Sequence, residues 1–458
     1  MEEWVSAACD YIASWLEFHM RLSRLPGCIV VIMHRDQIVF ERAYGFADLA
    51  TGEALTPRHR FRIASHSKAF TAAGIMKLRE AGKLRLDDPI DQYVKGLHPQ
   101  IGEATISQLL SHSAGLVRDG ADAGFFEDRR PFPTVDQLMA DLQDPPVIEP
   151  NTRHKYSNHG FGLLGLAIGA ITGEPYRTWI KREIVEAAGL EETEPDVPIA
   201  DGVLFARGHT GELLLGKRLV IPGDYTLNAV APAGGFVSTA SDLAKYFAQL
   251  APDAPRSALS AGSRREMIRR HWRSPHLSIE RYYGLGIMSG NTEGWKWFGH
   301  GGGLQGYASF TCVVPERELT VSILTNASDG WAGYWVEGAL HILRRFATRG
   351  APSEKVRDWA GRWWNLWGAV DLVPVGDGVL VANPWIGKPL LDASEIEITG
   401  QDEGRIALAS GGGSHGERVQ RTRDAGGAVR EVWLAATRFV TEAEAAAEME
   451  SRYAARGV

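Results

Sequence analysis

Residues 63–70 constrain this chain more than any other stretch, because they place a serine and a lysine at helical spacing where a helix is expected to begin. Apolar residues follow at the positions expected of a helix, namely Phe70, Ile75, Met76 and Leu78. Residues three apart are neighbours on a helix, so we expect the Lys68 amine within reach of the Ser65 hydroxyl. A helix start also offers free backbone N–H groups and a positive dipole beside Ser65.

The spacing of Ser65 and Lys68 has two interpretations, a catalytic pair and a chance occurrence of the motif. A serine hydroxyl becomes a good nucleophile only when a nearby base takes its proton. Lys68 can be that base only if burial or neighbouring positive charge lowers its pKa. However, a chain of 458 residues is expected to contain about one Ser-x-x-Lys by chance. The motif therefore needs partners elsewhere in the chain before it indicates catalysis.

Charge and cysteine content exclude several classes of protein. The net charge of -7, with no run of Lys or Arg, argues against a nucleic-acid partner. The apolar content of 44% and charged content of 23% are typical of a soluble globular protein. Cys9, Cys28 and Cys312 are far apart and fit neither a disulfide framework nor a zinc site, so we expect a reducing compartment.

The start of the chain carries no targeting signal that we recognise. Residues 1–4 are acidic and lack the basic start and apolar run of a signal peptide. No apolar run reaches the roughly 20 residues that a membrane-spanning helix needs. We therefore expect a cytoplasmic protein with no membrane partner, the alternative being a leader removed from the chain.

The order of helical and strand-like patterns favours an α+β fold with an antiparallel sheet. The expected helices lie at 4–22, 161–171 (ending at Gly173), 176–188, 241–250 (capped by Ser241 or Asp242) and 331–346. The expected strands lie at 28–33, 38–44, 282–288, 295–298, 306–314 and 319–324. We predict that the first hairpin and the last meander share one sheet flanked by the terminal helices.

The character of the sequence changes near residues 350–352. Four tryptophans follow within residues 359–367. Short strand-like pieces alternate with Gly-rich turns beyond them, at 379–382, 396–399, 406–409 and 429–435, before a helical pattern at 441–455. Several short, evenly spaced strands predict a small β-barrel or sandwich. The sequence therefore predicts two domains, 1–350 and 351–458.

Tyr156-Ser157-Asn158 offers a first set of partners for Ser65. The phenol could shuttle protons, and the Asn158 amide could orient Lys68 and a substrate carbonyl. To act as a base near neutrality, Tyr156 would have to lose about three units from a reference pKa near 10, which a neighbouring ammonium favours. The alternative is a buried tyrosine at a helix start, with Asn158 as the N-cap.

The glycine-rich residues 299–303 offer a second set of partners. Glycine lets a backbone approach a ligand closely, so a strand edge here could supply one oxyanion N–H, with Ser65 supplying the other. His300 could position substrate or assist proton transfer. The alternative is a hairpin turn with an incidental histidine. We expect the other nearby histidines, His66 and His112, to be structural.

Together these motifs resemble the penicillin-binding-protein-like serine hydrolases, whose pattern is S-x-x-K, S-D-N and K-T-G. The matching residues are Ser65-x-x-Lys68, Tyr156-x-Asn158 and His300-x-Gly302. Tyrosine in the second motif is similar to class C β-lactamases, and His-Gly-Gly in the third to D-aminopeptidases and related esterases and amidases. The segments 87–90 and 105–116 also resemble the family, and the resemblance covers about residues 10–347.

The resemblance implies a β-lactamase/transpeptidase-like fold, with helices flanking an antiparallel sheet and an all-helical subdomain. The C-terminal region resembles the lipocalin-like domains of some members. Its role could be to cap the cleft, to bind substrate or to mediate oligomers, and the sequence does not decide among them.

The resemblance also implies a mechanism. Ser65 forms an acyl-enzyme, while Lys68 and Tyr156 share the acid and base work and Asn158 supports them. The N–H groups of Ser65 and Gly303 hold the oxyanion, beside His300 and Gly302 in the third motif. No metal or organic cofactor is required.

The third motif bears on the substrate. A histidine is charged only part of the time near neutrality, so carboxylate binding at His300, and with it β-lactam hydrolysis, ranks lower. We therefore expect a small-molecule or short-peptide substrate cleaved at an amide or peptide bond, as in D-aminopeptidases and amidases. A carboxylesterase is the first alternative, and a β-lactamase or a non-hydrolytic penicillin-binding protein the second. Assembly into a homo-oligomer remains open.

Overall fold

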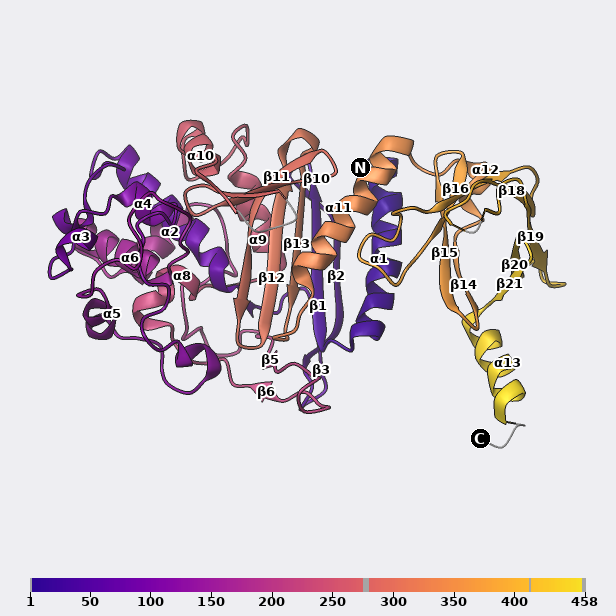
Figure 1. Ribbon diagram of the computed structural model, residues 1–458, viewed down its shortest axis with the longest axis horizontal. Helices are drawn as coiled ribbons and strands as arrows, with labels where there is room; N and C mark the ends of the chain where they lie inside the picture. The colour runs from indigo at the N-terminus through magenta and orange to yellow at the C-terminus, as the bar shows by residue number, and fades with distance from the viewer. Residues whose placement is uncertain (1, 275–279, 412, 455–458) are drawn as a thin grey trace. The chain divides into compact units, whose positions relative to one another are not determined.

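The computed structural model describes residues 2–274, 280–411 and 413–454 (Figure 1). The chain forms two compact units, one of Arg24–Val336 and one of Met1–Ser23 with Glu337–Val458. This grouping joins the N-terminal helix α1 (Glu3–Ser23) to the C-terminal region. The division into domains at residue 350 stays a prediction.

A nine-stranded sheet forms the centre of the first unit, and its named strand pairs are antiparallel. Its order is β3 (Glu53–Ala54), β2 (Gln37–Asp48), β1 (Gly27–His34), β13 (Leu319–Thr325), β12 (Tyr307–Val314), β11 (Trp295–Leu304), β10 (Met288–Thr292), β9 (Arg281–Tyr283) and β8 (Trp272–Arg273). The fully buried strand β1 pairs with β13, from Cys28 opposite Thr325 to His34 opposite Leu319. The N-terminal hairpin and the late meander therefore share one sheet, as predicted.

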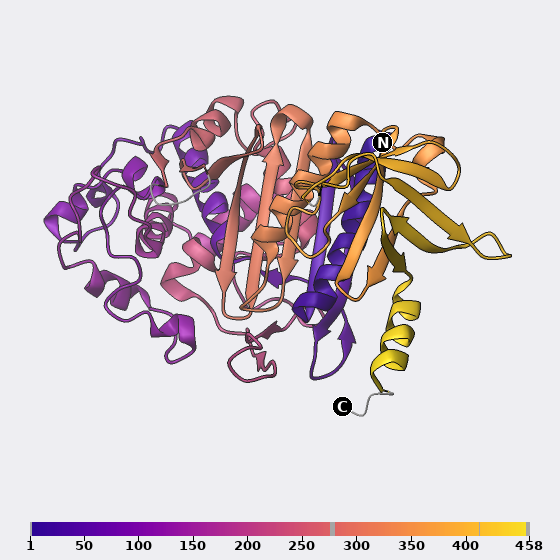
Figure 2. The same ribbon diagram turned by 45° about the vertical axis from the view of Figure 1, so that its right-hand side comes forward.

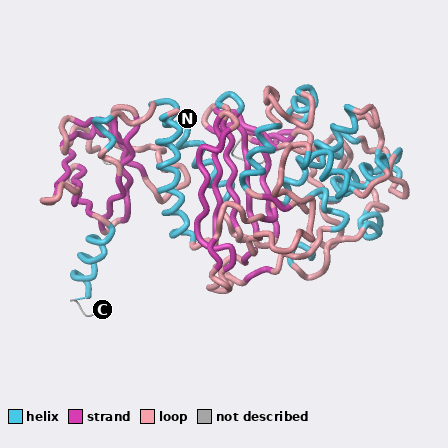
Figure 3. Tube along the Cα trace, turned by 180° about the vertical axis from the view of Figure 1, so that it is seen from behind, coloured by secondary structure: helices cyan, strands magenta, loops and turns pink. Residues whose placement is uncertain are grey.

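A cluster of helices of the same unit extends beyond one edge of this sheet (Figure 3). Helix α9 (Ala240–Gln249) packs on β1, β12 and β13, which covers one face. The elements that carry the site come from a helical cluster made of α2 (Ser67–Glu80), α4 (Ile106–Leu110), α6 (Asn158–Thr172), α7 (Tyr176–Ile180) and α8 (Ala231–Gly234). Three further helices of this unit are α3 (Pro99–Gly102), α5 (Val135–Asp141) and α10 (Ala261–Ile268).

Local sequence signals explain where α6 begins and ends. The Ser157 hydroxyl accepts a hydrogen bond from the backbone N–H of Gly160 at 3.0 Å, which makes Ser157, and not Asn158, the N-cap. Gly173 follows the last turn with φ +72°, a conformation that glycine adopts without strain. The buried helix predicted over 161–171 is thus confirmed and begins three residues earlier.

Three details differ from the sequence-based expectations. Thr239, and not Ser241 or Asp242, caps α9, accepting from the N–H of Asp242 at 3.2 Å. The strand expected over 282–288 is divided between β9 and β10 by a turn. Residues 299–303 continue inside β11 and form no turn, and the glycines among them let the strand run close to its neighbours.

The second unit contains a closed eight-stranded barrel, whose strands curve around one another in Figure 2. The strands are β14 (Gly361–Asn365), β15 (Gly368–Val375), β16 (Gly378–Ala382), β17 (Ser394–Ile398), β18 (Glu403–Leu408), β19 (Arg418–Arg423), β20 (Val429–Leu434) and β21 (Thr437–Val440). Trp364 opposite Val440 closes it, and Val379, Ile396, Val419 and Val432 are among the apolar side chains that form its core. The barrel-like prediction is therefore confirmed.

The remaining helices are α11 (Ala332–Arg349), α12 (Glu354–Arg357) and α13 (Glu442–Ala454). Within the part of the chain that the structure describes, no helix combines the length and the apolar character needed to cross a bilayer.

Candidate active site

Ser65 lies in a single 3₁₀ turn (Ala64–His66) directly before α2, and it lines a cavity of about 940 Å³. Ala64 has φ +48°, a left-handed conformation that is uncommon for residues other than glycine. The buried Ser67 hydroxyl stabilises this turn, because it donates to the Ala64 carbonyl at 2.6 Å and accepts from the Phe236 N–H at 3.0 Å. The strained turn presents the Ser65 side chain to the cavity.

Lys68 is fully buried on the first turn of α2. Its Nζ lies 2.7 Å from Asn158 Oδ1, 2.8 Å from the Ala233 carbonyl oxygen and 3.2 Å from Ser65 Oγ. Burial lowers the pKa of Lys68 well below its usual value of 10.5, and Asp119 opposes part of that shift. Because carbonyl oxygens only accept, a neutral amine directs its two N–H groups at them and keeps its lone pair for the Ser65 hydroxyl.

Tyr156 completes the surroundings of Ser65 from another segment. Its hydroxyl donates to Ser65 Oγ at 3.0 Å, and its ring centroid lies 4.7 Å from Lys68 Nζ. Burial raises the pKa of Tyr156 above its usual value of 10, and the hydrogen bond with Ser65 only partly offsets this. The direction is opposite to the lowering expected from a lysine ammonium: burial has the largest influence on the pKa of Tyr156, and the lowering influences come from the Ser65 hydrogen bond and from Arg118.

Asn158 connects Lys68 to a carboxylate that the sequence analysis missed. Its Oδ1 accepts from Lys68, and its Nδ2 donates to Asp119 Oδ1 at 2.6 Å. Asp119 is buried and pairs with Arg118 at 3.0 Å between Nε and Oδ2. Asp119 fixes which way the Asn158 amide faces. Its only sequence signal was its place in an irregular Gly- and Asp-rich segment.

The third motif contributes less to the cavity than predicted. His300 is 2% exposed and does not line the cavity. One of its ring nitrogens lies 3.0 Å from the Tyr283 hydroxyl and the other 2.7 Å from the Gly301 carbonyl oxygen. Burial lowers the pKa of His300 well below its usual value. His300 is therefore buried outside the cavity lining, and its lowered pKa favours the neutral ring.

Strand alternation explains this placement. Successive residues of a strand face opposite sides, so His300 and Gly302 share one face of β11. A Cβ at Gly302 would lie 2.2 Å from the Ile63 carbonyl oxygen, which shows that this face packs against the turn before α2. Gly303 lines the cavity together with Ser65, and a Cβ there would meet no described atom within 4 Å. The structure therefore brings together Ser65, Lys68, Tyr156, Asn158 and Gly303, but leaves His300 and Gly302 outside the cavity.

The rest of the cavity lining includes apolar, acidic and neutral polar side chains. The apolar part includes Phe126, Ile221, Leu227, Val230, Leu304 and Tyr307. The acidic part is Asp119, Glu127 and Asp128, and Arg118 accompanies it. Among the described residues, no group of three or more His, Cys, Asp or Glu side chains could hold a metal ion.

Comparison with known proteins gives this arrangement a family. Residues 12–334 match the protein family described as Beta-lactamase. This chain belongs to the beta-lactamase family. As a member, it is a serine hydrolase, and the position of Ser65 at the cavity, 3.2 Å from the buried Lys68 amine, fits that chemistry.

Individual relatives are distant. Penicillin-binding protein 4 of Amycolatopsis lactamdurans is 28% identical over 66% of this chain and 81% of its own length. Protein flp of Staphylococcus aureus (strain N315) is 24% identical over 70% of this chain and 64% of its own length.

Solved structures share the fold. The octameric penicillin-binding protein homologue from Pyrococcus abyssi has a TM-score of 0.65 at 24% identity, covering 94% of this chain and 99% of that one. The D-amino acid amidase from Ochrobactrum anthropi SV3, complexed with D-phenylalanine, has a TM-score of 0.63 at 22% identity. The match covers 74% of this chain and 98% of the amidase chain. The predicted β-lactamase/transpeptidase-like fold is therefore confirmed.

Proposed function

We propose that this protein hydrolyses amide or peptide bonds of small substrates through an acyl-enzyme at Ser65. The observation that carries the proposal is the position of Ser65 Oγ, 3.2 Å from the buried Lys68 amine and 3.0 Å from the Tyr156 hydroxyl. Lys68 can take a proton from Ser65, and Tyr156 can donate one.

Acylation begins at the serine. As Ser65 Oγ bonds to the substrate carbonyl carbon, its proton passes to the lone pair of Lys68, and the carbonyl π electrons move onto the oxygen. The backbone N–H groups of Ser65 and Gly303 would stabilise this oxyanion at the cavity wall. The C–N bond then breaks, the leaving nitrogen takes the Tyr156 proton, and the Lys68 ammonium reprotonates Tyr156.

Deacylation uses the same groups in reverse. Lys68 takes a proton from water, whose oxygen bonds to the acyl carbon. When the C–Oγ bond breaks, Tyr156, which already donates to Ser65 Oγ, returns the proton to the serine, and Lys68 restores Tyr156. A tyrosine whose pKa is raised by burial keeps its proton near neutrality and so suits the role of acid.

The cavity also bears on the substrate. Its charged lining has three carboxylates and one guanidinium, and His300 lends it no positive charge. This composition supports substrates that are neutral or carry an amine over those that present a carboxylate. Two proteins of similar fold are described as a D-stereospecific amidohydrolase and a D-amino acid amidase, which supports amides of D-amino acids as the first substrates to test.

Covalent labelling tests the proposal. The intact mass of the protein should rise by one phosphonyl group after treatment with a fluorophosphonate, whereas Ser65→Ala should not change. Ser328→Ala, which removes another serine of the same cavity lining, is the matched control and should still be labelled. Labelling of Ser65→Ala would overturn the proposal. Turnover of D- and L-alanine p-nitroanilides against p-nitrophenyl esters would then separate an amidase from a carboxylesterase.

Three further expectations stay predictions. They are the cytoplasmic location, the role of the barrel and assembly into a homo-oligomer, which the octameric Pyrococcus homologue supports. Sedimentation of the full chain would test the last of them.

A further inference from the structure

We propose that His112 is a positioning residue, which holds Tyr156 at hydrogen-bonding distance from Ser65. The inference rests on the proposed function, in which Tyr156 is the proton donor. His112 contacts the Tyr156 segment in three ways. Its carbonyl oxygen accepts from the Lys155 N–H at 2.7 Å, and its Nδ1 accepts from the Ser157 N–H at 3.2 Å. Its ring also packs on the Tyr156 ring, with centroids 4.1 Å apart.

One residue thus binds the backbone on both sides of Tyr156 and the ring between them. Residues 154–157 form no helix or strand, so no ladder of backbone hydrogen bonds fixes them. The contacts with His112 supply part of that missing constraint. A shift of about 1 Å in a catalytic group can lower a rate by about 100-fold, so this restraint bears directly on the Tyr156 hydroxyl.

The backbone of His112 is adapted to this task. It follows α4 with φ +59°, in the left-handed region where Asn, Asp and His occur more often than other residues with a side chain. The residue is 2% exposed, and its own N–H donates to the Leu109 carbonyl oxygen at 3.3 Å. This conformation lets a single residue offer both its carbonyl oxygen and its ring to the same segment.

The hydrogen bonds also define the tautomer. Because the Ser157 N–H donates to Nδ1, that nitrogen carries no proton, and the proton of the neutral ring lies on Nε2. Nε2 is buried and has no hydrogen-bond partner among the described residues. Burial and the nearby Lys68 lower the pKa of His112 well below its usual value, which keeps the Nδ1 acceptor available near neutrality.

Two substitutions separate the contributions of His112. His112→Asn keeps a side-chain acceptor and tolerates the left-handed backbone, whereas His112→Phe keeps a ring but loses the acceptor. Each is made in the natural chain and in Tyr156→Phe, and kcat is measured for hydrolysis of p-nitrophenyl acetate. In the natural chain we expect His112→Phe to lower kcat about 10-fold or more, and His112→Asn to stay within about 3-fold.

The Tyr156→Phe background decides between positioning and general damage. If His112 acts through the Tyr156 hydroxyl, His112→Phe should change kcat by less than about 2-fold once that hydroxyl is gone. Equal losses in both backgrounds, or full activity of His112→Phe in the natural chain, would overturn this inference alone. Natural activity of Tyr156→Phe itself would overturn both the inference and the proposed role of Tyr156.

A second buried histidine provides the matched control. His59 is 1% exposed, and its Nδ1 accepts the Thr56 N–H at 3.0 Å in a turn outside the cavity lining. His59→Phe should lower the melting temperature but leave kcat unchanged. If His112→Phe does not fold, His112→Gly replaces it in both backgrounds, because glycine adopts the same φ without strain and also lacks the acceptor.

Discussion

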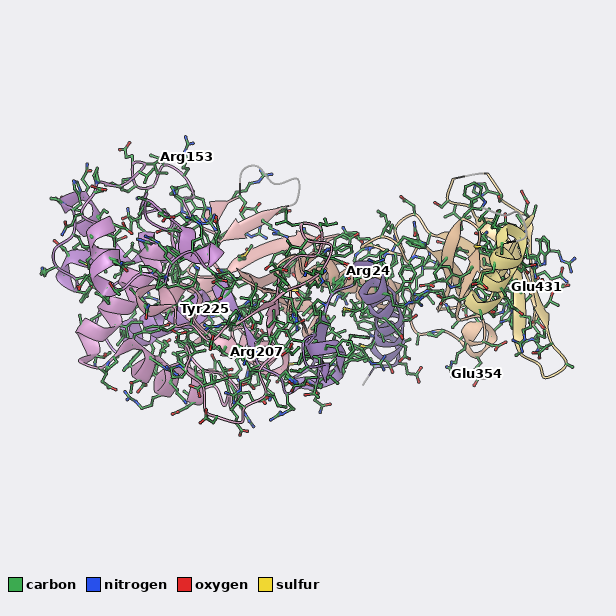
Figure 4. All side chains as sticks on the ribbon, turned by 90° about the horizontal axis from the view of Figure 1, so that it is seen from below. Arg24, Arg153, Arg207, Tyr225, Glu354 and Glu431 are labelled. Atoms are coloured by element: carbon green, nitrogen blue, oxygen red, sulfur yellow. The ribbon has the colours of Figure 1, made fainter. Side chains whose placement is uncertain are left out.

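Two buried basic side chains, six residues apart, have opposite surroundings. Arg62 donates to Asp196 Oδ1 at 3.3 Å and to the Gly223 carbonyl oxygen at 2.7 Å, and it also contacts Tyr225, which is labelled in Figure 4. Lys68 instead meets the Asn158 and Ala233 carbonyl oxygens and the Ser65 hydroxyl.

The difference shows how one region of the fold holds Arg62 as a charged group that links distant segments, here called the anchor, and Lys68 as a candidate base. A guanidinium paired with a carboxylate keeps its charge and ties distant segments together. An amine buried among neutral oxygens loses its proton more easily, which is what nucleophile activation requires. Each prediction below tests one side of this contrast.

The largest effect is expected from Lys68→Arg, which places a permanently charged group at the position of the base. A guanidinium cannot accept the Ser65 proton near neutrality, so kcat/KM should fall by about 1,000-fold or more. Steady-state kinetics and the rate of fluorophosphonate labelling both measure this. Lys77→Arg, further along α2, is the control and should keep its activity. A Lys68→Arg enzyme with near-natural turnover would remove Lys68 from the role of base.

Arg62→Met tests the anchor. It leaves Asp196 as a buried carboxylate without its cation, which typically costs about 3–5 kcal/mol of the free energy of unfolding. Urea denaturation of the full chain measures this change. The exposed pair of Arg35 with Glu318 gives the comparison, because Arg35→Met should cost less than about 1 kcal/mol. Similar decreases in the free energy of unfolding for the two variants would show that Arg62 contributes no more to stability than an exposed arginine.

The stability of the protein should depend on pH through Lys68. Its folded pKa is lowered, so between that pKa and about 10.4 the unfolded chain binds one more proton than the folded chain. The free energy of unfolding should therefore rise with pH, by at most about 1.4 kcal/mol per unit from this group. Lys68→Met should lose this part of the slope. Parallel curves for both proteins in urea at pH 7, 8 and 9 would mean that Lys68 stays charged when folded.

The smallest effect is expected at His300. The sequence suggested that His300 could position the substrate, but its buried position predicts that His300→Ala lowers kcat/KM uniformly, within about 5-fold, across substrates. Relative kcat/KM values for p-nitrophenyl esters and alanine p-nitroanilides measure this. A reversed preference between those substrates would place His300 at the substrate after all.

Short-range patterns accounted for much of the fold. The Ser65 and Lys68 spacing, the hairpin that becomes β1 and β2, and the helix ending at Gly173 all depend on residues within a few positions of one another. The barrel strands β14, β15, β19 and β21 were not predicted, although pairing with their neighbours in the barrel defines them in the structure.

The candidate site was predicted less completely. Asp119 was missed, since it does not lie near Asn158 in the sequence. His300 was expected at the substrate, because a motif gives spacing but does not show which face of a strand a residue occupies.

The sequence by itself determined which chemical groups are available and that a hydroxyl and an amine share one helical turn. Only the tertiary structure decided their protonation and orientation. Lys68 is buried by segments that begin ninety residues away with Asn158 and extend to Ala233, and such burial shifts the pKa. Desolvation depends on every atom around a group, whereas sequence spacing describes only its neighbours along the chain.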